Sequence, residues 1–130
     1  MIKSCVCNNN KSFKQCCGPL LERVKIAKTP QQLMRSRFSA FAIGGYGEYL
    51  LETWAPEARK GLSVFDLSLK SVDWRRLDII DKSQTGNQAS VEFKAHFMSE
   101  YGVEKTHHEI SQFHRRSNRW FYVSGEVFEV

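Results

Sequence analysis

The sequence has 130 residues, of which 42% are hydrophobic and 12% aromatic, and its formal net charge is +5. The length suits one domain, and the many Phe, Tyr and Trp residues provide for a buried core, which excludes a disordered tail, a collagen-like chain and a coiled coil. The longest uncharged segment, residues 38–47, is interrupted by glycines, so we expect a cytoplasmic protein with neither a secretory signal nor a membrane span.

Basic side chains are concentrated in the N-terminal third of the chain. Residues 1–40 carry eight Lys and Arg side chains and one acidic side chain, whereas residues 41–130 carry eleven basic and thirteen acidic ones. This asymmetry favours an anionic partner for the N-terminal segment. The alternative is that these side chains are simply solvated and keep the protein soluble.

All four cysteines lie within the first seventeen residues, as Cys5, Cys7, Cys16 and Cys17. Two thiolates from a tight turn and two from the returning chain can supply a tetrahedral zinc site, and iron suits four thiolates as well. The intervening Asn8–Asn10 tolerate the left-handed backbone that a chain needs to fold around an ion. Two disulfides are the alternative, but they need an oxidising compartment, so we expect a metal.

The side chains beside the cysteines have two interpretations. Lys3, Lys11 and Lys14 either offset the negative charge of four thiolates or, together with Phe13, form a surface for a partner. Phe13 is then either a contact residue or a hydrophobic plug under the metal loop. We expect the plug.

Helical patterns follow the cysteines. Thr29 is a suitable N-cap, Pro30 suits the first helical position and Gln32 completes a capping box, which predicts a helix that ends at the Gly44-Gly45 pair. Helical spacing continues over residues 46–54, and residues 63–71 are expected to form a third short helix.

The second half of the sequence has the alternating pattern of strands. We expect strands over residues 74–83, 88–101, 104–116 and 119–124, separated by turn residues. Helices followed by consecutive strands indicate an α+β fold, with N-terminal helices packed on a curved antiparallel sheet. The apolar residues assigned to this core all lie beyond residue 30.

The third strand carries the best candidates for a pocket in the sheet. Neighbouring strand residues point to opposite faces, so only one of His108 and Glu109 can enter a given pocket. Glu109 shares its face with Ser111 and His107. We expect these residues to have a structural role as hydrogen-bonded residues of the sheet. Trp54 is a further candidate pocket residue.

Two arginines on the first predicted helix need a partner. Arg35 and Arg37 diverge by about 200° on a helix, so at least one lies near the sheet edge or the metal loop. An arginine could form an anion pocket with Ser36, or an ion pair with a carboxylate. We expect the ion pair, and the candidate carboxylates are Glu52, Asp78 and Glu109.

The pattern Cys5-x-Cys7-x8-Cys16-Cys17, followed by Gly18-Pro19, resembles the SEC-C motif, a zinc-binding element similar to the tail of the SecA translocation motor. This resemblance implies zinc on the four cysteines and partners in the export chaperone and ribosome class. Asn9 and Asn10 stand where a Ser-Gly pair is usual, which removes a hydroxyl near the metal.

Later segments extend the resemblance to nearly the whole chain. Residues 29–42, 53–56, 108–113 and 120–122 fall in the same order as motifs of the bacterial YchJ family, although Ala55 stands where a His is usual. The resemblance implies a SEC-C element in residues 1–22, a nuclear transport factor 2-like (NTF2-like) cone in residues 23–130, and no settled activity.

Taken together, these patterns favour a binding protein over an enzyme. We expect a metal-binding accessory protein whose SEC-C element contacts a protein or ribonucleoprotein partner. The alternative is a small-ligand binder or an enzyme that works in the cone pocket. Direct reading of DNA sequence is not expected, because no recognition helix accompanies the basic residues.

Overall fold

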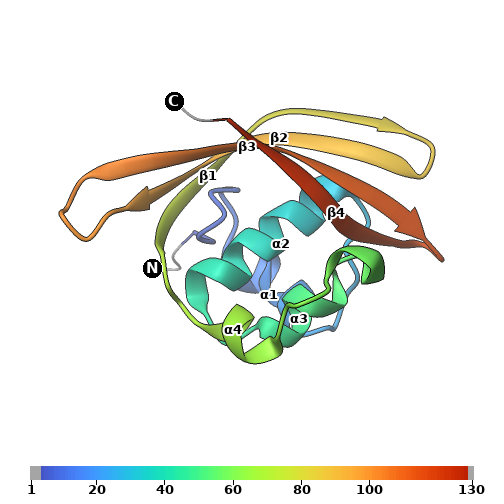
Figure 1. Ribbon diagram of the computed structural model, residues 1–130, viewed down its shortest axis with the longest axis horizontal. Coiled ribbons are helices and arrows are strands. Elements are labelled where there is room, and N and C mark those ends of the chain that lie inside the picture. The colour runs from blue at the N-terminus through green and yellow to red at the C-terminus, as the bar shows by residue number, and fades with distance from the viewer. Residues whose placement is uncertain (1–3, 129–130) are drawn as a thin grey trace.

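Helices cover one face of a single twisted sheet in the computed structural model, which describes residues 4–128 (Figure 1). The elements in chain order are the 3-10 turn η1 (Phe13–Gln15), α1 (Gly18–Leu21), α2 (Pro30–Ile43), α3 (Gly47–Glu52), the 3-10 turn η2 (Pro56–Ala58), α4 (Val64–Ser68), β1 (Asp73–Thr85), β2 (Gln88–Met98), β3 (Glu104–Arg116) and β4 (Arg119–Phe128). The predicted α+β architecture, with N-terminal helices on a curved antiparallel sheet, is confirmed. None of the helices in the described part of the chain is both long and apolar enough to cross a bilayer.

The four strands follow one another in the sheet in the order β1-β2-β3-β4, and every pair is antiparallel. Register shifts leave an extra residue in β1 between Ile79 and Asp81, and in β4 between Tyr122 and Ser124, where it pairs with β3. Such bulges bend a strand and increase its twist, which curves the sheet around the helices. The result is a concave face that α2 crosses (Figure 1).

The start of α2 follows the capping pattern in the sequence. The Thr29 hydroxyl accepts a hydrogen bond from the backbone N–H of Gln32 at 3.1 Å, and the Gln32 side chain accepts one from the Lys28 N–H at 2.8 Å. Pro30 occupies the first turn, and Gly44 ends the helix with a φ of 83°. The bond to Thr29 satisfies an N–H group that a helix start leaves free. The Gln32 side chain reaches the N–H of Lys28, one residue before the N-cap, rather than the Thr29 N–H of the predicted capping box.

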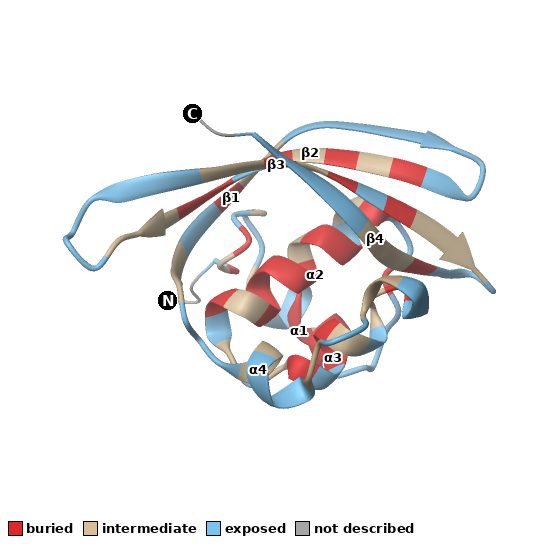
Figure 2. Cartoon of the chain, in the orientation of Figure 1, coloured by how far each residue is buried: buried red, intermediate tan, exposed pale blue. Residues whose placement is uncertain are grey.

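The core lies between α2 and the middle of the sheet, where the buried residues gather (Figure 2). It also includes Cys5, Cys7, Cys17 and the α1 residues Leu20 and Leu21. The expectation that the core begins beyond residue 30 is therefore wrong. The cysteine loop packs into the same hydrophobic cluster as the cone.

Several element ends differ from the predicted ones. A short helix, α1, begins at Gly18-Pro19, where the sequence pattern indicated only the end of the metal loop. Pro19 suits the first turn of a helix, and Gly18 is required because an added Cβ would lie 2.7 Å from the Phe13 carbonyl oxygen. The β2 strand ends at Met98, since residues 99–102 form a turn closed by the bond from the Gly102 N–H to the Ser99 carbonyl.

Candidate functional site

The metal loop, residues 5–17, is closed by its own backbone. The Cys5 N–H donates to the Lys11 carbonyl at 2.6 Å, and the Asn8 N–H donates to the Cys5 carbonyl at 3.0 Å. Asn8 and Asn10 have left-handed backbone conformations, with φ values of 66° and 57°. The prediction that asparagines provide the left-handed turn residues holds at these two positions.

The loop brings all four thiols together, with their Sγ atoms within 4.8 Å of one another. Cys16 Sγ lies 3.5 Å from Cys7 Sγ and 3.8 Å from Cys17 Sγ. A tetrahedral zinc ion with Zn–S bonds of about 2.3 Å places its sulfur ligands roughly 3.8 Å apart, so the donor set fits such an ion. All four cysteines are free thiols in this structure.

Groups around the sulfur atoms complete the site. The Asn9 side-chain amide donates to Cys16 Sγ at 3.7 Å, and the Ser39 hydroxyl of α2 lies 3.6 Å from Cys5 Sγ. Ser39 thus supplies a hydroxyl beside the thiols, although the loop lacks the usual serine. Such surrounding donors orient ligands and tune a metal site. Sequence reasoning missed Ser39, because it lies far from the cysteines in the chain.

Arg35 binds the loop from α2. Its Nη1 donates to the Cys7 carbonyl at 2.7 Å and lies 3.8 Å from Cys7 Sγ. Its Nε is buried without a hydrogen-bond partner in the described part of the chain. One of the two helix arginines therefore lies at the metal loop, where its positive charge opposes that of the thiolates.

The thiols cannot all ionise easily without a cation. The hydrogen bond between Cys5 and Cys17 holds the pKa of Cys5 far below its usual range and, together with burial, raises the pKa of Cys17 far above it. One thiolate is therefore stabilised by protons on its neighbours. A divalent cation replaces those protons and allows four thiolates in one site.

The loop residues that were considered for a partner surface differ in exposure. Lys11 and Lys14 are exposed, whereas Phe13 is half-buried and packs against the core cluster. The Phe13 ring lies against Gly18, as a plug under the loop would. Lys3 lies outside the described residues.

A separate cavity of about 240 Å³ lies inside the cone, between α2 and the sheet. Its polar lining residues are Arg37, His107 and Glu109. The other lining residues are apolar or aromatic, and they are Met34, Phe38, Phe41, Trp54, Trp74, Phe93, Ala95 and Tyr122.

Glu109 is the centre of a buried polar network. Its Oε1 accepts a hydrogen bond from His107 Nε2 at 2.8 Å, and its Oε2 accepts bonds from Ser111 at 2.5 Å and Tyr122 at 3.0 Å. Burial raises the pKa of Glu109, but the three hydrogen bonds outweigh this effect and hold the pKa below its ordinary value. The carboxylate is thus ionised at neutral pH. Sequence reasoning identified Glu109 and Ser111 but could not foresee Tyr122, which comes from β4.

Arg37 is 2% exposed and lies beside the same cavity. Its Nη1 donates to the Leu50 carbonyl at 2.8 Å and to the Thr53 hydroxyl at 2.7 Å. The guanidinium carbon lies 4.5 Å from the centre of the Trp54 ring and 4.8 Å from that of Tyr122. Burial lowers its pKa to about 10, so the group is still positively charged at neutral pH.

The carboxylates that were expected to pair with Arg35 or Arg37 bind other groups. Glu52 lies 3.2 Å from Arg23, and Asp78 lies 2.8 Å from His96. Among residues 4–128, no carboxylate is within ion-pair distance of either α2 arginine, so the predicted ion pair is wrong. Backbone carbonyls, a hydroxyl and aromatic rings take the place of a carboxylate.

The other candidates face away from the cavity. Ser36 donates to the Leu33 carbonyl at 2.9 Å and hydrogen-bonds with the Tyr49 hydroxyl at 2.6 Å, so it forms no anion pocket with an arginine. His108 pairs with Glu92 at 2.7 Å, on the face opposite Glu109. The prediction that only one residue of the His108-Glu109 pair enters the pocket is confirmed.

Comparison with known proteins places the chain in a family. Residues 29–125 match the family model described as the middle NTF2-like domain of YchJ. A UPF0225 protein of Photorhabdus laumondii is 35% identical over 130 residues, which cover 96% of this chain and 81% of that protein. A UPF0225 protein of Corynebacterium glutamicum is 34% identical, with 98% of this chain and 99% of that protein covered.

Two solved structures share the whole fold. The solution structure of a SEC-C motif containing protein from Rhodopseudomonas palustris has a TM-score of 0.88 and 36% identity, and covers 98% of this chain and 100% of that one. The crystal structure of a SEC-C motif containing protein from Psychrobacter arcticus has a TM-score of 0.83 and 26% identity, and covers 99% of this chain and 85% of that one. The chain belongs to the YchJ family, in which it joins a SEC-C cysteine cluster to an NTF2-like cone.

Proposed function

We propose that this protein is a cytoplasmic metal-binding accessory protein, in which the metal loop holds one zinc ion and so shapes a surface for a protein or ribonucleoprotein partner. The observation that carries the proposal is the approach of four free thiols, with Sγ atoms within 4.8 Å. Cys5, Cys7, Cys16 and Cys17 would be the ligands. Iron is the alternative metal, since four thiolates suit both ions.

The surroundings of the loop support a structural metal rather than a reactive one. Cys5, Cys7 and Cys17 are buried, and four thiolates leave no open coordination position for a substrate. Arg35 and Ser39 fix the loop to α2. The metal would therefore hold the loop in place against the cone.

The exposed lysines of the loop support a role in partner binding. Lys11 and Lys14 are exposed and form no ion pair among residues 4–128, so their charge is free to attract an anionic surface. The resemblance of the cysteine pattern to the tail of SecA implies partners of the export chaperone and ribosome class, and we propose this class for the present chain. Phe13, which packs under the loop, would hold the lysines in place rather than contact the partner.

The test compares partner capture with and without the metal. Tagged wild-type protein, Cys7→Ser and Ser12→Ala are used to capture partners from a bacterial lysate, and the captured proteins are quantified by mass spectrometry. Ser12 lies in the same loop and makes no side-chain capping bond, so Ser12→Ala is the matched control. We expect Cys7→Ser alone to lose the partners. An unchanged partner set would contradict the proposal.

A second measurement guards against simple misfolding of Cys7→Ser, since Cys7 is fully buried. Zinc is removed from the wild-type protein by a chelator and then restored. We expect capture to be lost and recovered with the metal, while circular dichroism shows that the sheet is retained. Capture that is indifferent to chelation would count against the metal-dependent role.

The cone cavity gives a second candidate function, the binding of a small aromatic acid. Both hydrogens of Arg37 Nη1 are used inside the protein, but Nε and Nη2 have no acceptor among the described residues. A ligand carboxylate could accept from them in a bidentate pair, with its ring among the aromatic lining residues.

This second candidate is tested by NMR with benzoate and indole-3-acetate as probes. We expect saturable shifts of the Trp54 and Trp74 indole signals, because both rings line the cavity. Trp120, which lies outside it, is the internal control. Equal shifts of all three indole signals, or no shift of any, would contradict ligand binding in the cone cavity.

A further inference from the structure

Two cavities adjoin at the linker between α1 and α2. One, of about 550 Å³, lies between this linker, α3 and the start of β4, and the other, of about 220 Å³, lies beside the metal loop. Both are lined by Leu20, Lys25 and Ile26, so they adjoin at these residues, and we name the two together the basic groove. The groove is distinct from the cone cavity and shares no lining residue with its polar network.

Cations dominate the lining of the basic groove. Its basic residues are Lys11, Arg23, Lys25, Lys28, Arg35, Arg59 and Arg119, and its only acidic lining residue is Glu52. Arg23 lies between two carboxylates, at 3.0 Å from Glu48 and 3.2 Å from Glu52, so its own charge is offset. Arg59 donates to the Leu51 carbonyl at 3.1 Å, which fixes its position without cancelling its charge. Arg35 is held at the thiols of the metal loop. The remaining basic residues of the groove have no acidic partner among residues 4–128, and they are Lys11, Lys25, Lys28, Arg59 and Arg119.

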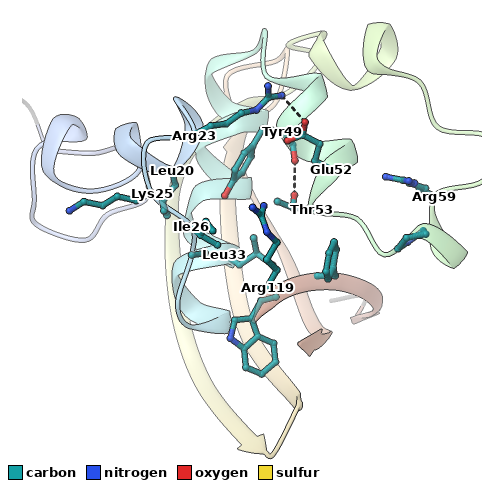
Figure 3. Close-up of a pocket in the computed structure, with 14 residues that line it drawn as sticks. Leu20, Arg23, Lys25, Ile26, Leu33, Tyr49, Glu52, Thr53, Arg59 and Arg119 are labelled. Atoms are coloured by element: carbon teal, nitrogen blue, oxygen red, sulfur yellow. Dashed lines mark hydrogen bonds and ion pairs between the residues drawn. The ribbon is translucent and has the colours of Figure 1, made fainter. Parts of the chain in front are cut away.

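The side chains approach the larger cavity from different segments (Figure 3). Arg119 extends from β4 into the centre of the view, and Arg59 points toward it from the turn after η2. Lys25 extends from the linker away from Arg119. No ion pair is formed by Lys25, Arg59 or Arg119 within residues 4–128. Arg59 and Arg119 approach the cavity from two different segments without a counter-ion, and such an arrangement favours an anionic occupant.

The groove also offers an apolar surface between its charges. Among its apolar lining residues, Pro56 is exposed and Phe121 is half-buried, and Ile26 is 49% exposed at the junction of the two cavities, whereas Leu20 and Leu33 are buried. Exposed aliphatic groups beside basic ones suit a polypeptide that alternates acidic and apolar side chains.

Single-stranded RNA fits this lining less well, because unspecific binding of bases relies on open aromatic faces. Tyr49 and Trp120 of the groove are 7% and 3% exposed, and Tyr49 is bonded to Ser36. The guanidinium of Arg115 covers the Trp120 ring at 5.1 Å. Tyr49 and Trp120 therefore belong to the core, and within residues 4–128 the half-buried Phe121 is the one other aromatic residue of the lining. The groove thus has no row of open rings on which successive bases could stack.

We infer that the basic groove binds an acidic and apolar peptide segment of the partner protein. This inference rests on the proposed adaptor function and names the surface and the chemistry of the contact. Cys16 and Cys17 line the loop side of the groove, so the metal would shape part of its wall.

The test uses a fluorescein-labelled peptide of alternating Glu and Leu and a control peptide with Gln in place of Glu. Binding is measured by fluorescence anisotropy at low and high salt. We expect the acidic peptide alone to bind, and Lys25→Gln/Arg59→Gln/Arg119→Gln to weaken it by about tenfold. The matched control is Lys70→Gln/Lys94→Gln/Lys105→Gln, which removes the same charge from exposed positions outside the groove.

The outcomes separate this inference from the proposed function. If the wild-type protein binds zinc but neither triple variant differs from it, the groove is overturned and the metal role stands. If labelled oligouridine binds and the acidic peptide does not, the occupant is RNA and the inference is wrong. If zinc is absent yet the acidic peptide binds in the groove, the inference stands and the metal-dependent adaptor role fails.

Discussion

Arg37 is the residue at which charge and burial conflict most directly. A buried cation costs free energy unless it is well paired, and here its partners are a carbonyl, a hydroxyl and two aromatic rings rather than a carboxylate. Glu109 contributes only at a distance, by raising the pKa of the arginine. The residue holds α3 and β4 to α2, since its partners come from those segments.

Replacement of Arg37 by methionine should destabilise the protein by about 2 kcal/mol, because the Leu50 carbonyl loses a buried partner and the stack with Trp54 and Tyr122 is lost. Urea denaturation measures this change. Arg75→Met removes an exposed arginine of β1 and should change stability by less than about 0.5 kcal/mol. A more stable Arg37→Met would show that the cost of burying the charge outweighs its contacts.

The lowered pKa of Glu109 predicts that the stability of the protein depends on pH in the acidic range. Its pKa in the folded protein lies below the ordinary value of 4.5, so its contribution is full above that value and is lost as the pH falls through the lowered pKa. The free energy of unfolding should therefore decline as the pH falls below about 4.5, and Glu109→Gln should show a shallower decline.

The matched control is Glu126→Gln, at an exposed position of β4, which should keep the wild-type pH profile. Urea denaturation at several acidic pH values compares the three proteins. A profile for Glu109→Gln that parallels the wild-type one would show that the network around Glu109 does not favour its ionised form.

Among the elements, α2 connects the two candidate sites. Arg35 and Ser39 lie on the side that contacts the metal loop, and Arg37 and Phe38 line or border the cone cavity. A shift or fraying of this helix would disturb both sites together. Its capping contacts therefore matter beyond local stability.

Removal of the Thr29 cap should destabilise the protein by about 1 kcal/mol, since the Gln32 N–H loses its acceptor. Thr29→Ala tests this by thermal or chemical denaturation, and Thr29→Ser, which keeps the hydroxyl, is the control and should restore most of the stability. Equal stability of Thr29→Ala and Thr29→Ser would show that the cap contributes little here.

Local patterns in the sequence were enough to predict this helix and the sheet. Thr29, Pro30 and Gln32 mark the helix start by contacts within one turn, and the third strand was predicted with its observed limits because turn residues flank it. The four cysteines were predictable because their spacing is itself local. The left-handed turn residues Asn8 and Asn10 were predictable because they lie between the two cysteine pairs.

Contacts between distant segments were not predictable in this way. Ser39 reaches Cys5 across 34 positions, and Tyr122 reaches Glu109 from a different strand. The ion pair expected for Arg35 or Arg37 is not formed, because Arg35 binds the Cys7 carbonyl and the guanidinium of Arg37 lies beside two aromatic rings. No periodicity or spacing along the chain predicts these long-range contacts, because they depend on how the sheet curves over α2.

At the scale of the whole molecule, the metal loop and the cone share one hydrophobic core. Cys5, Cys7 and Cys17 pack with α1 and α2, so the loop is part of the fold rather than an appended tail. The concave sheet covers the helices, and the basic groove runs where loop, linker and β4 meet. A change in the conformation of the loop should therefore change the stability of the entire protein.

Metal removal should lower the melting temperature of the zinc-loaded protein by more than about 5 °C, because ion binding is coupled to folding of the loop and hence of the core. Thermal denaturation with and without a chelator measures the shift. Cys16→Ser, which changes the half-buried ligand, should start lower and show no further effect of the chelator. A chelator-insensitive wild-type melting temperature would contradict this coupling.

The central claim is that Cys5, Cys7, Cys16 and Cys17 bind one metal ion, and elemental mass spectrometry combined with a free-thiol count tests it most directly. On protein purified under reducing conditions, we expect one equivalent of zinc per chain, with four thiols that react only after chelation and unfolding. Protein with no bound metal, and with its thiols either freely reactive or blocked as disulfides, would contradict the account.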